Sequence, residues 1–311
     1  MPAAEMRRIG FLAAAIVLGL LLGLGASQED AHSAPAIKDD SGDLAVRINS
    51  FVASIPTAGS EAYDVPTRSE RKKMAAAFDA IDAGKLSRAA SLAGPLKYDV
   101  VRYEDTVTGR THVVLSERQN ADGSWPHAWG MYVFSPEAAS DTTVEVPHPV
   151  ADANTEDVGV EVFREADAED LFIAGAHRDT NAGGSADVAH ASKSVFQGIH
   201  QAAIKPSTKV FQPHGFSQAD HPNCGEAVVS AGTAPPTQLA QTVHSNLRNG
   251  GFDARLYDGV SCPDLGATTN VQGIWTRAIG ADFLHVEASK PIRDDIARRS
   301  VFSDIVAGAL R

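Results

Sequence analysis

The sequence has few cysteines: Cys224 and Cys262 are the only two among 311 residues. Neither belongs to a Cys-x-x-Cys pair, so we do not expect a zinc site built from thiolates. In an oxidising compartment two thiols pair more often than they stay free, and closing this loop contributes about 4 kcal/mol in the chain-entropy model. We therefore predict a Cys224–Cys262 disulfide, with two separate buried thiols as the alternative.

A surplus of basic residues is also missing. The chain has 27 Lys and Arg against 39 Asp and Glu, which gives a formal net charge of −12. Proteins that bind duplex nucleic acid need a basic surface to neutralise phosphates, so we expect no nucleic-acid partner. The sequence has no Gly-x-Ser-x-Gly motif either, which argues against serine-based acyl transfer. At 43% hydrophobic residues, the composition is that of a globular protein with a sizeable core.

The N-terminal segment has the order of a signal peptide. Arg7 and Arg8 precede an uncharged run from Ile9 to Ala26, and polar residues follow it. We predict that residues 1–27 are a signal peptide or, if they are not cleaved, a membrane anchor. Both alternatives predict that the rest of the chain is secreted or extracytoplasmic, with membrane contact only through an uncleaved segment.

Composition and periodicity divide the remaining chain into three parts. Residues 28–42 are polar and rich in Pro and Ala, which predicts a flexible linker. Apolar residues at helical spacing over 43–94 predict a helical extension. From residue 95 the period changes to two, and strands then alternate with helices, so 95–311 is predicted to be the functional domain.

The elements predicted in this domain begin with antiparallel strands. The predicted strands are 98–103, 111–116, 129–134, 143–146, 171–174, 208–212 and 283–287. The predicted helices are 156–166, 188–203, 238–249 and 292–310. This order predicts an α/β fold with a mixed, mostly parallel central sheet and helices on both faces.

Histidines stand at four predicted strand ends. The segments are TVEVPHPVAD with His148, LFIAGAHRD with His177, KVFQPHGF with His214, and FLHVEAS with His285. A single histidine in such a place is more often structural. Because ligands of open α/β sheets bind at the carboxyl ends of the strands, four of them indicate one shared site.

These side chains suit a catalytic zinc ion, which takes three protein ligands and keeps one position open for water. His148 and His214 are the best pair of nitrogen ligands, since Gly or Pro beside each ring lets the chain turn sharply. The third ligand is Asp152 or Glu156, with Asp152 preferred because it lies in the turn close to His148. Glu156 has a second explanation as an acid that faces the dipole of a helix start.

Further residues are candidates for chemistry around the metal. Glu287, two residues from His285 and on the same face of a strand, fits a general base, although it is also explained as an acid facing solvent. Arg178 is a candidate to bind a substrate carboxylate, or else a structural ion pair. His177 is a candidate to stabilise an oxyanion.

Two more residues are candidates for binding substrate. His190 lies three residues after Asp187 at a predicted helix start, where it orients another group, binds substrate or belongs to the helix cap. Asn270 is a loop amide in the segment TTNVQG.

In this order, the motifs VPHPVAD, AGAHRDTN, FQPHGF and FLHVEAS resemble the superfamily of zinc carboxypeptidases, N-formylglutamate amidohydrolases and poly-γ-glutamate hydrolases. The resemblance covers about residues 98–295. It implies that His148 and His214 bind zinc with Asp152 or Glu156, that Glu287 is the base, and that Arg178 binds a substrate carboxylate. The carboxypeptidases place the acidic ligand three residues after the first histidine, where this chain has Ala151.

The expected function is therefore hydrolysis of an amide bond by a zinc-activated water. The bond is a peptide, γ-glutamyl or N-acyl amide, and the substrate is a small peptide or acyl-amino acid, including cell-wall peptides or polyglutamate. Two alternatives remain open: a non-catalytic protein that binds the cell wall or another ligand on a degenerate hydrolase fold, and a metal-independent enzyme that uses His and Asp.

Overall fold

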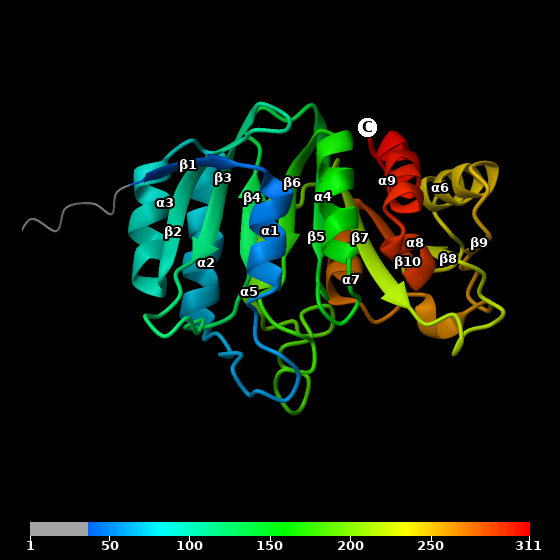
Figure 1. Ribbon diagram of the computed structural model, residues 1–311, viewed down its shortest axis with the longest axis horizontal. Helices are drawn as coiled ribbons and strands as arrows, with labels where there is room; N and C mark the ends of the chain where they lie inside the picture. The colour runs from blue at the N-terminus through cyan, green and yellow to red at the C-terminus, as the bar shows by residue number, and fades with distance from the viewer. Residues whose placement is uncertain (1–36) are drawn as a thin grey trace, which may run out of the picture. The chain divides into compact units, whose positions relative to one another are not determined.

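The computed structural model describes residues 37–311, so the predicted signal segment and most of the predicted linker lie outside it. The described residues form one ten-stranded sheet in the order β1-β2-β3-β4-β6-β5-β7-β10-β8-β9 (Figure 1). The strands are β1 (Lys38–Gly42), β2 (Tyr98–Asp105), β3 (Arg110–Glu117), β4 (Met131–Phe134), β5 (Ser140–Val146), β6 (Ala168–Ile173), β7 (Lys209–Phe216), β8 (Ala227–Ser230), β9 (Ala254–Leu256) and β10 (Asp282–Ser289).

The centre of the sheet is parallel. Strands β6, β5, β7 and β10 are neighbours and run in the same direction. Strands β2, β3 and β4 form an antiparallel arm on one side, and β8 pairs antiparallel with β10 on the other. The prediction of a mixed, mostly parallel sheet is confirmed, and the carboxyl ends of the four central strands meet at one edge.

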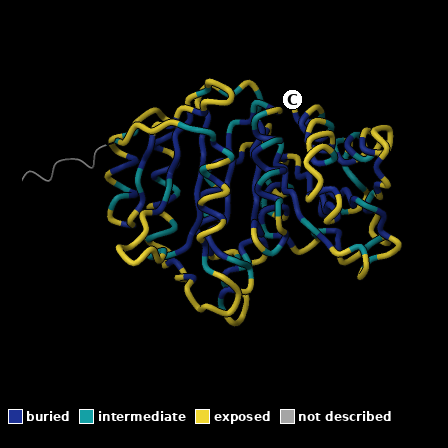
Figure 2. Tube along the Cα trace, in the orientation of Figure 1, coloured by how far each residue is buried: buried dark blue, intermediate teal, exposed yellow. Residues whose placement is uncertain are grey.

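Helices cover both faces of this sheet, as predicted (Figure 1). One apolar core lies under α1, α4, α6, α8 and α9, and the other lies under α2, α3 and α5. The helices are α1 (Leu44–Val52), α2 (Arg68–Asp82), α3 (Leu86–Ala93), α4 (Thr155–Glu165), α5 (Val195–Ala203), α6 (Gln238–Asn249), α7 (Val271–Ala278), α8 (Lys290–Asp294) and α9 (Ile296–Leu310), with short 3₁₀ turns at Gly94–Leu96 and Pro263–Leu265. Figure 2 shows the result: the central strands are buried, and exposed residues lie on loops and outer helix faces.

Several elements differ from the sequence prediction. Lys38–Gly42, within the predicted linker, forms β1 and pairs with β2. The helix predicted from residue 188 begins only at Val195, because the Ser194 hydroxyl accepts a hydrogen bond from the Gln197 N–H and caps it there. The predicted C-terminal helix is divided at Asp295, whose carboxylate caps α9. The prediction also missed the short strands β8 and β9 and the helix α7.

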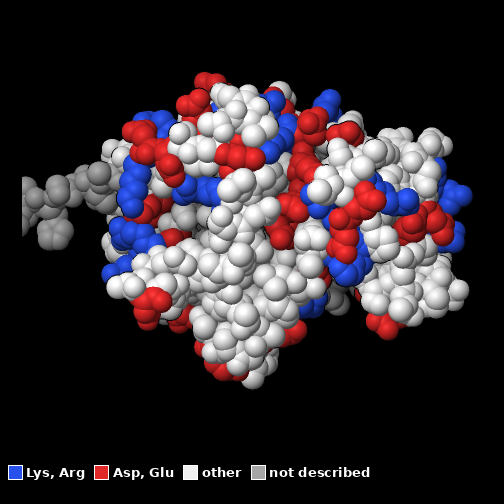
Figure 3. Space-filling view, viewed as in Figure 1, with Lys and Arg blue, Asp and Glu red and all other residues white. Residues whose placement is uncertain are grey.

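The disulfide prediction is confirmed, since Cys224 and Cys262 are bonded with their Cα atoms 5.8 Å apart. The bond ties the segment after β7 to the loop before the 3₁₀ turn at Pro263–Leu265. Between residues 37 and 311, no helix has the length and apolar character needed to cross a bilayer. On the face drawn in Figure 3, acidic and basic side chains are intermixed over the described part of the chain.

Gly159 sets how closely α4 lies on the sheet. A Cβ atom added there would meet Val146 Cγ2 at 2.5 Å. We expect Gly159→Ala to lower the free energy of unfolding by about 1–3 kcal/mol, because overpacking outweighs the gain in helix propensity. Gly308 in α9 has no neighbour within 4 Å of its added Cβ, so Gly308→Ala is the matched control and should stabilise. Urea unfolding of both variants checks this, and equal effects would contradict the close packing of α4.

Candidate metal centre

His148 and Asp152 are brought together by a turn that follows β5. The Asp152 backbone N–H donates to the His148 carbonyl over 2.9 Å, which closes one helical turn. Residues four apart in such a turn lie on the same side of the chain. As a result His148 Nδ1 lies 3.3 Å from Asp152 Oδ2, with both side chains buried.

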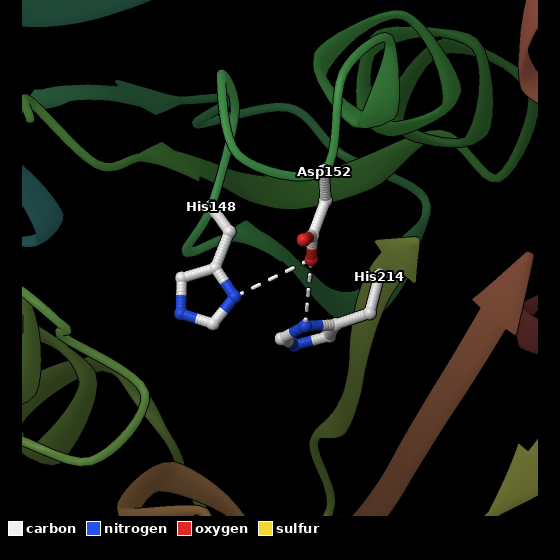
Figure 4. A group of neighbouring side chains, drawn as sticks. All are labelled: His148, Asp152 and His214. Carbon is white, nitrogen blue, oxygen red and sulfur yellow. Dashed lines mark hydrogen bonds and ion pairs between the residues drawn. The ribbon is translucent and has the colours of Figure 1, made fainter. Parts of the chain in front are cut away.

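His214 reaches the same carboxylate from the neighbouring strand β7. Its Nδ1 lies 3.2 Å from Asp152 Oδ2, and its ring centroid lies 4.9 Å from that of His148. Figure 4 shows the Asp152 carboxylate between the two rings. Each of these three residues offers one atom that could bind a metal ion, and these atoms all lie within 4.8 Å of one another. The imidazoles from distant parts of the chain therefore converge, as the sequence prediction requires.

The other ring nitrogen of each histidine, Nε2, lies within hydrogen-bonding distance of a second side chain; below, these second side chains are called the outer partners. His148 Nε2 lies 2.8 Å from Asp187 Oδ1. His214 Nε2 lies 3.3 Å from Gln212 Oε1, and the Gln212 amide is oriented by its Nε2, which donates to Glu145 Oε2 over 2.7 Å. Both outer partners are acceptors, which favours a proton on Nε2 of each ring when Nδ1 binds a cation.

This hydrogen-bond pattern fits a cation at the centre. With Nε2 protonated, a neutral ring presents the lone pair of Nδ1, and both Nδ1 atoms face the Asp152 carboxylate. Burial would raise the pKa of Asp152, but the hydrogen bonds from His148 and His214 hold it well below its usual range. Burial lowers the pKa of His214 and favours its neutral form. Burial also acts to lower the pKa of His148, but the hydrogen bonds to Asp152 and Asp187 outweigh it and raise that pKa, so His148 is neutral only when a cation takes the place of the proton on Nδ1. Two imidazoles and one carboxylate are the ligand set of a catalytic zinc site, and the carboxylate–histidine pair of Asp187 and His148 is the usual support for one.

Glu287 lies next to this group on β10. The parallel register of β10 and β7 pairs Glu287 with His214. Its Oε2 is buried without a hydrogen-bond partner among the described residues, and Oε1 lies 3.6 Å from His285 Nε2. Burial raises the pKa of Glu287 to about 8. A buried carboxyl with one free oxygen and a raised pKa has the properties of a general base or acid.

A cavity of about 360 Å³ opens over these residues. Its wall includes most of the predicted site: His148, Arg178, His190, His214, Asn270, and Glu287. His285 also lines it and packs against His214 with ring centroids 4.4 Å apart. Burial lowers the pKa of His285 well below its usual value, so this ring is neutral.

Arg178 and His190 share Asp187 as their acceptor. Arg178 Nη2 donates to Asp187 Oδ2 over 2.7 Å, and His190 Nδ1 lies 3.1 Å from the same oxygen. Arg178 is about one third exposed, with further N–H groups beyond the one that Asp187 uses. The guanidinium thus forms the structural ion pair that the sequence offered as one alternative, and it also lies on the cavity wall; its binding of a substrate carboxylate stays a prediction.

Three predicted residues have other surroundings. His177 does not line the cavity; its Nδ1 accepts a hydrogen bond from the Asp179 N–H in a local turn. Asn270 lines the cavity, but both ends of its amide are used, by the Gly273 N–H and by Gln212 Oε1. Glu156 is buried in the first turn of α4 outside the converging group, and burial raises its pKa to about 7. The geometry thus favours Asp152 over Glu156 as the third ligand.

Two partners of the central histidines were not predicted from the sequence. Asp187 was placed only at a predicted helix start, because residues 188–194 were assigned to a helix that begins at Val195. Gln212 was not identified, although its position two residues before His214 places it on the same face of β7. The alternation of side chains between the two faces of the strand was therefore the signal that could have identified Gln212.

Comparison with known proteins gives matches only among solved structures, since no family model and no curated protein matches the chain. A bacteriophage poly-γ-glutamate hydrolase matches 65% of this chain and 88% of its own, with 13% identity and a TM-score of 0.40. An aspartoacylase-family protein of Mesorhizobium loti matches 64% of this chain and 66% of its own, with 11% identity and a TM-score of 0.39.

A succinylglutamate desuccinylase of Chromobacterium violaceum matches 65% of this chain and 67% of its own, with 12% identity and a TM-score of 0.35. These matches include the kind of protein that the sequence motifs resemble. At such low identities and TM-scores they carry no argument about activity, so the chemistry must be argued from the side chains of the site.

Proposed function

We propose that this protein is a zinc-dependent hydrolase of amide bonds that works outside the cytoplasm. The observation that carries the proposal is the convergence of His148 Nδ1, His214 Nδ1 and the Asp152 carboxylate, with both Nε2 atoms bound to acceptors. The predicted export segment and the Cys224–Cys262 disulfide support the location.

A bound zinc ion would supply a Lewis acid that polarises a carbonyl group and lowers the pKa of water. The other roles belong to the chain. Glu287 is placed to accept a proton at its free Oε2 and to return it to the leaving amine. Asp187 holds the His148 ring through Nε2, and Gln212 does the same for His214.

Arg178 supports a substrate with an anionic group near the scissile amide. Its guanidinium lies on the cavity wall, and it is fixed by Asp187, which limits the freedom it would lose on binding. A carboxylate is one of the groups that such a fork binds through two parallel hydrogen bonds. Peptides with a free carboxyl end, γ-glutamyl peptides and N-acyl amino acids share this feature.

The buried Glu287 oxygen argues for an enzyme over the alternative of a non-catalytic binding protein. Glu287 Oε2 has no hydrogen-bond partner among the described residues, and unlike Glu156, whose Oε2 is also buried without one, Glu287 lines the cavity beside the proposed ligands. That position is the one that a general base needs.

Metal removal tests the proposal directly. We expect the purified protein to hydrolyse at least one of these three substrate classes, to lose that activity in a zinc chelator, and to regain it when zinc is added. Hydrolysis that continues after zinc has been removed would contradict the zinc dependence. A zinc-loaded chain that binds such compounds without cleaving any of them would support the binding protein instead.

A further inference from the structure

A buried polar network contacts the proposed metal site through Gln212. At its centre is Glu145 on β5, whose carboxylate is fully buried and contacts two side chains. One oxygen lies 2.7 Å from His200 Nδ1 on α5, and the other accepts a hydrogen bond from Gln212 Nε2 over 2.7 Å. Burying a carboxylate completely is costly, so its retention between two sheet strands and a helix calls for a reason.

The network connects this carboxylate to a proposed zinc ligand. The register of β5 and β7 pairs Val144 with Phe211, which brings Glu145 beside Gln212. Glu145 can only accept, so it fixes the Gln212 amide with Nε2 toward itself and Oε1 toward the site. Oε1 then faces His214 Nε2 at 3.3 Å and also accepts from Asn270 Nδ2 over 2.7 Å.

We propose that Glu145 and Gln212 are positioning residues that set the tautomer of His214. An acceptor at Gln212 Oε1 places the ring proton on Nε2 and leaves the Nδ1 lone pair free for the metal. Were the Gln212 amide reversed, its NH₂ group would face His214 Nε2, and the ring proton would move to Nδ1, where it competes with the metal. The inference rests on the proposed function, because it assigns His214 as a ligand.

Glu145→Gln should allow the Gln212 amide to reverse and should therefore weaken zinc binding. The new amide can donate to Gln212 as well as accept from it, so only the hydrogen bond from Asn270 and the longer one to Gln272 still orient the Gln212 side chain. We expect the zinc dissociation constant to rise about 10- to 100-fold, the usual effect of replacing the outer partner of a metal-bound histidine. Gln212→Met removes the acceptor at similar size and should weaken zinc binding by a similar factor.

A charge-swapped double variant separates this role from a merely structural one. In Glu145→Gln with Gln212→Glu, the carboxylate at 212 accepts from His214 Nε2 and Asn270, while the amide at 145 donates to it and accepts from His200. The hydrogen bonds to His214, Asn270 and His200 and the one between positions 145 and 212 are kept, and the acceptor facing His214 is restored; only the longer hydrogen bond from position 212 to Gln272 Oε1, at 3.4 Å, is lost. We expect zinc affinity within a few-fold of the wild type.

Thr143→Val is the matched control. Thr143 lies on the same strand as Glu145, is equally buried, and donates to Asp170 Oδ2 over 3.1 Å without contacting the site. It should change stability but leave zinc affinity unaltered. Zinc dissociation constants are measured on the full chain by competition with a chelator, and urea unfolding of each zinc-free variant reports the change in stability.

Weaker zinc binding by Glu145→Gln and Gln212→Met, with recovery in the double variant, is the expected result. If the wild type binds zinc and Glu145→Gln binds it equally well, or the folded double variant fails to recover affinity, the inference is overturned while the proposed function stands. If the wild type binds no zinc, the proposed function fails and the inference with it.

Discussion

Glu287→Gln is expected to lower the turnover of the amide substrate by about 10²- to 10⁴-fold, the usual contribution of general acid–base catalysis, while zinc stays bound. Glutamine has nearly the same shape as glutamate but cannot accept the proton. Glu287 lies outside the group of His148, Asp152 and His214, although with His214 and His285 it forms a second group whose atoms could hold a metal ion. If the ion is held by the first group, the substitution should leave its ligands in place. Turnover and zinc content measured on the same preparation check both halves of the expectation.

Glu156→Gln is the matched control for this substitution. Glu156 is another buried glutamate near the site, but it lies outside the converging ligand group. It should retain both zinc and activity. Full activity in Glu287→Gln would show that the proton is accepted elsewhere, and loss of zinc in Glu156→Gln would make Glu156 a ligand in place of Asp152.

The second large effect is expected at the ligands themselves. His148→Ala and His214→Ala each leave two ligands of three, so zinc content should fall from about one per chain to nearly none, and activity should fall with it. His112→Ala is the control, since His112 is buried on β3 and bonded to Ser135 on the neighbouring strand β4. Metal analysis after gel filtration checks the three variants together.

Loss of zinc in His112→Ala as well would indicate a general effect of unfolding. Near-stoichiometric zinc in both His148→Ala and His214→Ala would mean that the ion is held elsewhere. A thermal shift on adding zinc gives an independent reading, because a ligand that binds only the folded state stabilises it in proportion to its affinity.

The sequence was sufficient to predict the convergence of the histidines. His148 and His214 follow or end strands that the structure makes parallel neighbours, and the carboxyl ends of such strands meet at one edge. Glu287 could be placed on the same edge because it ends a third strand, β10, that pairs in parallel with β7.

The identity of the third ligand depended on a turn that the sequence did not determine. Ala151 occupies the position that carries the acid in the carboxypeptidases, and both Asp152 and Glu156 remained as substitutes. The hydrogen bond from the Asp152 N–H to the His148 carbonyl winds the chain through a full turn. That winding brings a side chain four residues after His148, where Asp152 stands, back beside the ring.

The partners that orient the histidines were the hardest to predict. Asp187 reaches His148 from a loop without regular structure, in which Gly183 and Gly184 have positive φ angles. No periodicity describes such a segment, so the long-range contact with His148 had no local signal. His177 was placed with the site because it ends a central strand, but the following turn uses its ring nitrogen locally.

The central claim is that one zinc ion is held between β5 and β7. The most direct measurement is a crystal structure of the zinc-loaded protein with anomalous scattering data at the zinc edge. We expect a single strong peak at about 2.0–2.2 Å from His148 Nδ1, His214 Nδ1 and an Asp152 carboxylate oxygen, the usual zinc–ligand distances. An anomalous peak bound by other residues, or a fully zinc-exposed crystal with no peak between these three side chains, would contradict it.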